Sequence, residues 1–230
     1  MNVAAVITAA GSGTRLGAES PKALVLIEGR AVVAWAVLRL AEVVDSVVVT
    51  APAAHLDTMR AALADAGASA LVVSGGDTRQ ASVAAGLAAL DLAPDDIVLI
   101  HDAARAFQEP SVALATIAAV RAGADGAIPV LPVVDTLIGA ADADGTIGDV
   151  VDREALRAVQ TPQTFRAHVA LEAHASAATG ATATDDATLA RALGHRIVAV
   201  DGHEWGFKIT VPSDLPLARH IAQSLAGEAT

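Results

Sequence analysis

Short apolar runs alternate along this chain with longer segments whose apolar residues recur at helical spacing. The short runs predict buried strands at Val3–Ala9, Ser46–Thr50, Ala70–Val73, Ile97–Ile100 and Gly126–Val130. The segments between them predict helices at Ala31–Val44, His55–Ala66, Thr78–Leu90 and Ser111–Ala122. Because strands alternate with helices, we expect an α/β fold with a Rossmann-like, mostly parallel sheet and helices on both faces.

The segment Val133–Arg153 breaks this rhythm. It is rich in Asp and Gly, with the turn sequences DADG and IGDV between β-type residues, which predicts a protruding β-arm at about 133–153. Beyond it the pattern predicts helices near Arg166–Ala178 and Asp185–Leu193, strands Ile197–Val200 and Phe207–Thr210, and a last helix from Ser213. Since no repeat or long linker divides the chain, the simplest interpretation is a single domain, 1–230, that carries this arm.

Charge and composition narrow the possible functions. The chain has 230 residues and a formal net charge of −11, so it should repel nucleic acid polymers, although a local basic pocket could still bind a small phosphorylated ligand. There is no cysteine, which excludes thiolate catalysis and thiolate metal sites. No apolar run reaches the length of a membrane helix, and the start lacks a basic signal-peptide region. We therefore expect no membrane association and a cytoplasmic location.

The loop AAGSGTRLG follows the first predicted strand, and ligands of α/β sheets bind at the carboxyl ends of strands. Gly11 and Gly13 allow the backbone to approach a ligand, so that exposed N–H groups can hold phosphate oxygens. Arg15 and Lys22 add positive charge. The glycine spacing matches neither the dinucleotide fingerprint nor the P-loop. The loop is therefore predicted to bind phosphate by another scheme; the simpler alternative is a turn with surface cations.

Three further clusters carry polar groups near strand ends. In GGDTRQASV, Asp77 or Thr78 can cap the following helix. In HDAAR, the carboxylate of Asp102 would face a triphosphate only with a cation between them, and oxygen ligands suit Mg²⁺; a structural ion pair with Arg105 is the alternative. In GFKIT, Lys208 is costly to bury unless it meets an anion.

Taken in order, these and several later sequence motifs resemble those of a known family. They are AAGSGTRLG…PK, GGDTRQASV, HDAAR, Asp135-Thr136, Val151-Asp152-Arg153, Thr161-Pro162-Gln163, Thr184-Asp185-Asp186 and Lys208-Ile209-Thr210. The set is similar to that of the 2-C-methyl-D-erythritol 4-phosphate cytidylyltransferases, in the sugar-phosphate nucleotidyltransferase superfamily. The resemblance implies a fold of the nucleotide-diphospho-sugar transferase type. It also implies transfer of CMP from CTP to 2-C-methyl-D-erythritol 4-phosphate for isoprenoid synthesis, with Mg²⁺ as cofactor and a homodimer as the assembly.

The resemblance also implies roles for individual residues. The catalytic set would be Arg15, Lys22, Arg153 and Lys208. The substrate-binding set would be Ala9, Ala10, Gly11, Gly13, Gly76, Asp77, Ser82, Asp102, Ala103, Arg105, Thr136, Thr161 and Thr184, with Asp102 also facing the metal. Gly76, Asp77 and Ser82 would line the cytosine pocket. Thr136 and Arg153 would reach from the arm into the partner subunit's site.

The chain departs from the family pattern at a few positions. Ala106 follows Arg105 where proline is usual, Leu137-Ile138-Gly139 follows the Asp-Thr pair in place of a lysine, and Trp205-Gly206 precedes Phe207. Two other functions stay open at this point. One is a related transferase that acts on ribitol 5-phosphate, a sugar 1-phosphate or molybdopterin. The other is a non-catalytic sensor that binds CTP without releasing pyrophosphate.

Overall fold

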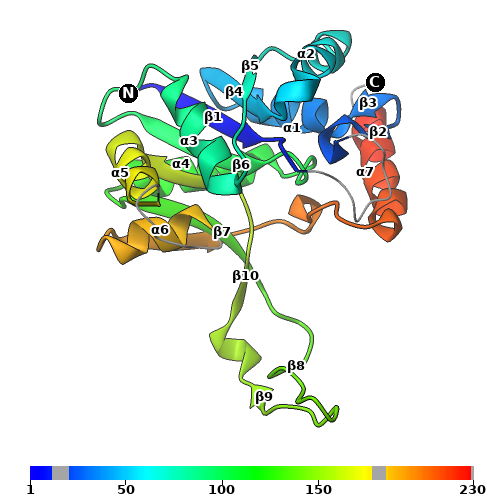
Figure 1. Cartoon of the computed structure of the whole chain (residues 1–230), viewed down its shortest axis with the longest axis vertical. Coiled ribbons are helices and arrows are strands. Elements are labelled where there is room, and N and C mark those ends of the chain that lie inside the picture. Colours follow the sequence, from blue (N-terminus) through cyan, green and yellow to red (C-terminus); the bar gives the residue numbers. More distant parts are fainter. Residues whose placement is uncertain (12–20, 178–184, 229–230) are drawn as a thin grey trace.

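The structure is a computed structural model and describes residues 1–11, 21–177 and 185–228. A central sheet dominates the body (Figure 1). Its strands are β1 (Val3–Thr8), β4 (Ser46–Ala51), β5 (Leu71–Ser74), β6 (Ile97–Asp102), β7 (Gly126–Pro132), β10 (Arg157–Val159), β11 (Gln163–Arg166) and β12 (Ile197–Asp201). Within the described residues, seven of these eight strands run in the order β10-β7-β11-β6-β1-β4-β5, and the eighth, β12, pairs with β7.

Parallel pairing brings the carboxyl ends of the central strands together. β1 pairs in parallel with β4 and β6, and β4 with β5. Thr8, the last residue of β1, is the register partner of both Thr50 and Asp102. β12 is also parallel to β7, whereas β10 and β11 pair antiparallel. The expectation of a mostly parallel sheet is confirmed, and its central carboxyl edge is where the polar clusters of the sequence meet.

Helices cover both faces of the sheet, as expected. They are α1 (Val32–Ala41), α2 (Leu56–Asp65), α3 (Arg79–Ala88), α4 (Pro110–Arg121), α5 (Ala167–Ala177), α6 (Asp186–Ala192) and α7 (Leu215–Glu228). Side chains alternate along β1, so Ala5 and Ile7 pack with α1, α2 and α4, whereas Val6 packs with α3, α5 and α6. A third cluster joins α7 to Trp35, Phe107 and the short hairpin β2 (Leu26–Ile27) and β3 (Arg30–Ala31).

The segment Phe207–Thr210 is not a strand, so that prediction was wrong. Its apolar residue Ile209 is fully buried in the α7 cluster, and its backbone N–H groups donate outside the sheet, from Phe207 N to Glu204 O at 3.1 Å and from Ile209 N to Ala104 O at 2.9 Å. The antiparallel strands β10 and β11 were not predicted. They carry polar residues such as Gln163 and Arg166, which do not form an apolar run.

Residues 133–156 extend away from the body as an arm (Figure 1). Within it β8 (Leu137–Ile138) pairs antiparallel with β9 (Val150–Val151), and Gly145 takes a positive φ of 88° in the turn between them. The protruding β-arm is thus present at the expected place. Its role in a dimer, and the treatment of 1–230 as one domain, remain predictions. In the described part of the chain, no helix is long and apolar enough to cross a bilayer.

Candidate active site

A cavity of about 450 Å³ opens where β1 and β6 end. It is lined by Thr8, Ala9, Ala10, Gly11, Lys22, Ala23, Gly76, Asp77, Thr78, Arg79, Ser82, Asp102, Ala103, Ala104, Lys208 and Thr210. These residues come from the ends of strands and the segments that follow them, from the 3-10 helix Lys22–Leu24, from the turn before α3 and its first turn, and from the loop that precedes α7. The sheet thereby gathers segments that are up to about two hundred residues apart in the sequence around one concave site, as expected for an α/β fold.

Most of the predicted site residues lie in the wall of this cavity. They are Ala9, Ala10, Gly11, Lys22, Gly76, Asp77, Ser82, Asp102, Ala103 and Lys208. Thr161 lies behind the wall and bonds to the backbone of Asp102, and Arg105 bonds to the loop that carries Lys208. Gly13, Arg15 and Thr184 lie outside the described residues.

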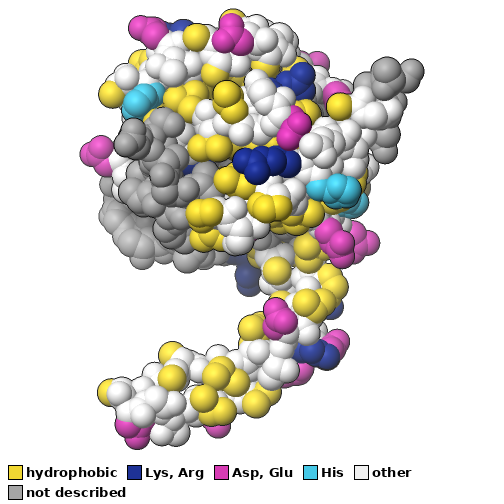
Figure 2. Space-filling model, turned by 90° about the vertical axis from the view of Figure 1, so that its right-hand side faces the viewer, with side chains coloured by type: hydrophobic (Ala, Val, Ile, Leu, Met, Phe, Trp, Pro, Cys, Tyr) yellow, Lys and Arg dark blue, Asp and Glu magenta, His cyan; other side chains and the backbone are white. Residues whose placement is uncertain are grey.

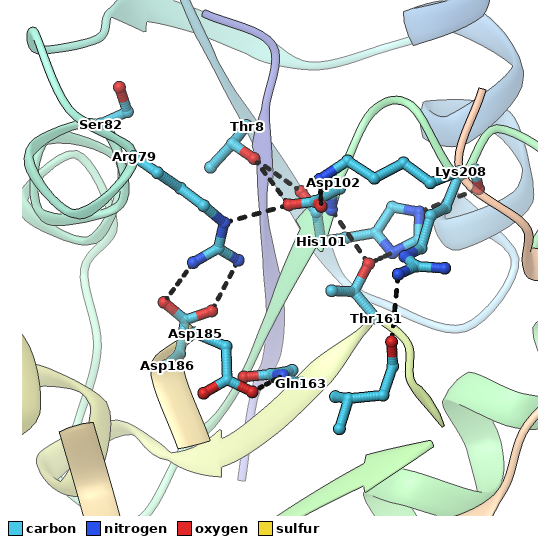
Figure 3. Close-up of polar contacts among 12 residues, drawn as sticks. Thr8, Arg79, Ser82, His101, Asp102, Thr161, Gln163, Asp185, Asp186 and Lys208 are labelled. Atoms are coloured by element: carbon cyan, nitrogen blue, oxygen red, sulfur yellow. Dashed lines mark hydrogen bonds and ion pairs between the residues drawn. The ribbon is translucent and has the colours of Figure 1, made fainter. Parts of the chain in front are cut away.

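Asp102 stands at the centre of the polar contacts in the cavity wall (Figure 3). Its Oδ1 atom accepts from Arg79 Nε at 3.1 Å, and its Oδ2 atom accepts from Lys208 Nζ at 2.7 Å. Burial on its own would raise the pKa of the Asp102 carboxyl. The charges of Arg79 and Lys208 outweigh burial and hold that pKa well below its usual range. Asp102 is therefore a fixed negative charge at neutral pH, paired with two cations that also face the cavity.

Arg105 does not form the ion pair considered as the alternative for HDAAR. Its Nη1 atom donates to the carbonyl of Gly206 at 2.7 Å, and its Nη2 atom donates to the carbonyl of Val159 at 3.1 Å. The guanidinium thus ties the loop that carries Lys208 to strand β10. In this structure Arg105 acts on backbone rather than on the cavity itself.

His101 and Thr161 form hydrogen bonds that hold the backbone of Asp102 in place. Thr161 Oγ1 accepts from the Asp102 backbone N–H at 3.1 Å and lies 2.9 Å from His101 Nδ1. His101 Nε2 lies 3.2 Å from the carbonyl oxygen of Arg105, which can only accept, so the ring carries its proton on Nε2. Burial lowers the pKa of His101 to about 4. His101 is thus a neutral, packed residue at the strand end.

The wall opposite Lys208 is built from the turn before α3. Thr78 caps this helix by accepting from Ala81 N at 3.0 Å. Ser82 Oγ accepts from the Gly76 N–H at 3.2 Å and donates to the carbonyl of Thr78 at 2.9 Å. A Cβ at Gly76 would lie 2.5 Å from the Cβ of Ala81, so this close turn requires glycine. Capping therefore falls to Thr78, while the neighbouring Asp77 lines the cavity.

Two glutamines hold the loop that carries Lys208. Gln160 donates from Nε2 to His203 O at 2.9 Å, and Gln108 donates from Nε2 to Gln160 Oε1 at 3.1 Å. A Cβ at Gly206 would lie 2.6 Å from Cδ of Gln108. This contact gives a physical reason for the departure from the family pattern at Gly206, because the loop packs directly on the Gln108 amide. Ala106, the other departure in this region, is buried in the α7 cluster.

Sequence reasoning missed two charged residues, Arg79 and Asp186. Arg79 lines the cavity and pairs with Asp102 and, through both terminal nitrogens, with Asp186 at 2.9 and 2.7 Å (Figure 3). Both residues belong to sequence motifs that were noted above, GGDTRQASV and Thr184-Asp185-Asp186. Each motif contains a charged residue to which no role was assigned, and this was the one sign in the sequence that could have pointed to them.

The arm residues lie apart from this cavity. Thr136 is exposed, and Arg153 donates from Nη1 to Val134 O at 2.6 Å while its Nε lies 3.6 Å from a carboxylate oxygen of Glu154. Among the residues that the structure describes, none from the arm lines the cavity. Apolar side chains are spread over the arm's surface (Figure 2). Within one subunit, Thr136 and Arg153 therefore do not contribute to the site.

Comparison with known proteins decides the family. The family model for 2-C-methyl-D-erythritol 4-phosphate cytidylyltransferase matches residues 3–224. The chain belongs to this family. It is 44% identical over 225 residues to the cytidylyltransferase of that name from Saccharopolyspora erythraea, covering 96% of this chain and 99% of the relative. It is 46% identical over 225 residues to that of Deinococcus radiodurans, covering 97% and 91%.

The fold of the cytidylyltransferase family is also found in solved structures. The crystal structure of the Thermus thermophilus cytidylyltransferase superposes with a TM-score of 0.79 at 38% identity, covering 97% of this chain and all of that one. The expected nucleotidyltransferase fold class is thereby confirmed. The cavity described above is the natural candidate for the active site of this family member.

Proposed function

We propose that this protein transfers CMP from CTP to 2-C-methyl-D-erythritol 4-phosphate, releasing pyrophosphate and 4-diphosphocytidyl-2-C-methyl-D-erythritol. Family membership supports the reaction, and the cavity supports its chemistry. The observation that carries the proposal is the set of three cations that line one cavity, Lys22, Arg79 and Lys208, with Arg79 contributed by the wall opposite Lys208. A site that joins two anions needs positive charge on both sides of the reacting phosphorus.

The reaction needs positioning and charge neutralisation more than proton transfer. The attacking phosphate oxygen of the acceptor is already ionised, so no general base is required. Lys22, together with Arg15 seven positions earlier in the sequence, would stabilise charge on the α-phosphate and the leaving pyrophosphate. Lys208 would bind the attacking phosphate. To do so, its ammonium group would have to donate to a phosphate oxygen as well as, or in place of, the carboxylate of Asp102. The backbone of Ala9 and Gly76 would read the cytosine, with Ser82 fixing the turn.

Mg²⁺ is the proposed cofactor. Among the described residues, Asp102 and Asp77 are the carboxylates in the cavity wall, and no group of three or more His, Cys, Asp or Glu could hold a metal. Asp102 would be the carboxylate that faces such an ion; because its two oxygens already accept from Arg79 and Lys208, most ligands would have to come from the nucleotide. Mg²⁺ held there would supply neutralisation of the triphosphate charge. Removing it with EDTA should abolish pyrophosphate release, and excess Mg²⁺ should restore it.

The proposed assembly is a homodimer in which the arm reaches the partner's site. Within the arm, Val134, Ile147 and Val150 are 77%, 66% and 70% exposed, which is costly unless another surface covers them. Arg153 and Thr136 would then contact the acceptor bound by the partner subunit. The cytoplasmic location remains a prediction from the sequence.

Pyrophosphate release with defined substrate pairs tests the reaction. We expect release with CTP and 2-C-methyl-D-erythritol 4-phosphate, and much slower release with ATP, GTP or UTP. Equal rates with ribitol 5-phosphate would reassign the acceptor. CTP binding without any pyrophosphate release would instead favour the non-catalytic sensor.

A further inference from the structure

Asp186 is a buried carboxylate that lies behind the cavity wall. It stands in the first turn of α6, and its side chain is 1% exposed. It accepts from Arg79 Nη1 at 2.9 Å, from Arg79 Nη2 at 2.7 Å and from His174 Nε2 at 3.1 Å. Burial alone would raise the pKa of Asp186, but the hydrogen bond from His174 and the charge of Arg79 lower it. Asp186 is therefore a buried charge with defined partners.

Arg79 joins this hidden carboxylate to the one in the cavity (Figure 3). Both terminal nitrogens are held by Asp186, which leaves Nε to donate to Asp102 Oδ1 at 3.1 Å. A bidentate contact fixes the plane of a guanidinium as well as its distance. The Arg79 side chain is 26% exposed and lines the cavity. Asp186, which does not line the cavity itself, thus determines the orientation of the Arg79 guanidinium in the cavity wall.

The first turn of α6 is itself fixed to the sheet. Asp185 caps the helix by accepting from Thr188 N at 2.9 Å, and its other oxygen accepts from Gln163 Nε2 at 2.9 Å. Gln163 Oε1 in turn accepts from Ala187 N at 2.9 Å. Strand β11 therefore holds the backbone on both sides of Asp186. The carboxylate of Asp186 is a rigid reference point rather than a side chain that follows Arg79.

We propose that Asp186 is a positioning residue for nucleotidyl transfer: it holds Arg79 in the orientation that leaves one oxygen of Asp102 directed at Lys208. This inference rests on the proposed function. Without the charge of Asp186, Arg79 would regain its torsional freedom. It could then engage both oxygens of Asp102, or an incoming phosphate, and Lys208 would lose its present partner. The geometry of the reacting groups would suffer more than the binding of the nucleotide.

Asp186→Asn tests this by removing the charge while keeping the shape. We expect kcat to fall by about 10- to 100-fold, as for small misplacements of catalytic groups, with KM for CTP changed less than about threefold. Asp57→Asn is the matched control, since Asp57 is 97% exposed, pairs with Arg60 within α2 and does not line the cavity. It should keep kcat near the wild-type value. A purely structural role for Asp186 would instead lower the melting temperature and leave kcat of the folded enzyme unchanged.

A double-mutant cycle tests whether Asp186 acts through Arg79. The double variant Arg79→Ala/Asp186→Asn should have the same kcat as Arg79→Ala alone. If Asp186 affects catalysis only by orienting Arg79, replacing Asp186 has no further effect once Arg79 is absent. Multiplied losses would overturn the proposal, and so would wild-type kcat in folded Asp186→Asn. If Asp186→Asn does not fold, Arg79→Lys decides, because lysine cannot hold both carboxylates; unchanged kcat there would also overturn the proposal. An inactive wild type would instead refute the proposed function, and with it this inference.

Discussion

Replacing Asp102 by asparagine should destabilise the protein in a manner that depends on pH. The carboxylate accepts one hydrogen bond each from Arg79 and Lys208, and its side chain is 10% exposed. A hydrogen bond to a charged group contributes roughly 1 kcal/mol more than a neutral one, so two such bonds give about 2 kcal/mol. Lys208 is 44% exposed, and asparagine is cheaper to bury than a carboxylate. These effects reduce the expected loss in the free energy of unfolding at pH 7 to about 1–2 kcal/mol.

The sign of the pH dependence follows from the direction of the pKa shift. The pKa of Asp102 is lowered in the folded protein, so its contribution is fully present above the ordinary carboxyl pKa of about 4. It is lost as the pH falls from there toward the lowered value. The difference between wild type and Asp102→Asn should therefore be constant from pH 5 to pH 8 and shrink below about pH 4.

Urea unfolding followed by circular dichroism measures this difference at each pH, in EDTA so that no metal contributes. Asp95→Asn is the control, because Asp95 is 82% exposed and lies 3.8 Å from Arg166 in a surface pair, so its loss should have no measurable effect at any of these pH values. An Asp102→Asn variant as stable as wild type at pH 7 would refute the reasoning. So would a stability difference that grows as the pH falls below 4.

Three further predictions concern the cavity and the arm. Lys22→Ala should lower kcat by on the order of 10²–10³ with a smaller change in CTP affinity, whereas a rise in KM alone would make Lys22 a binding residue only. Lys22→Ala and Arg153→Ala, each nearly inactive alone, should on mixing and subunit exchange restore about a quarter of wild-type sites; no recovery despite exchange seen by native mass spectrometry would exclude a shared site. Gly206→Ala should cost about 1–3 kcal/mol of stability by overpacking against Gln108 and should raise KM for the acceptor by displacing Lys208. Gln108→Ala alone should also destabilise the protein because it removes buried hydrogen bonds, but the loss in the double variant should be smaller than the sum of the two single losses. Strictly additive losses would show that this contact is not the cause of the Gly206→Ala defect.

Much of the central sheet could be predicted because buried parallel strands are continuous apolar runs. Val3–Ala9 and Ile97–Ile100 were predicted to be strands for this reason, and the structure has strands there. The same rule failed at Phe207–Thr210, where Ile209 is buried in a loop by side chains of α7 and Phe107. Burial there comes from tertiary packing, which an apolar pattern cannot distinguish from a strand.

The sequence predicts which residues line the site better than it predicts which of them contact one another. The cavity gathers Lys22, Asp102 and Lys208 at the carboxyl edge of the sheet. Asp102 ends β6, and the loop of Lys208 is joined to the residues just after β6 by the bond from Ile209 N to Ala104 O. The pairing of Arg79 with Asp186 spans 107 positions and depends on how α6 is held by the sheet. A single sequence carries no signal for which of several charges will meet over that separation.

The most direct test of the central claim follows the oxygen atoms through one reaction. The acceptor 2-C-methyl-D-erythritol 4-phosphate, with ¹⁸O in its phosphate oxygens, is incubated with CTP and Mg²⁺, and the products are weighed by mass spectrometry. Attack on the α-phosphorus of CTP predicts that all of the label remains in 4-diphosphocytidyl-2-C-methyl-D-erythritol and that the pyrophosphate is unlabelled. Release of CMP or CDP in place of pyrophosphate, or recovery of the labelled acceptor unchanged, would contradict the account.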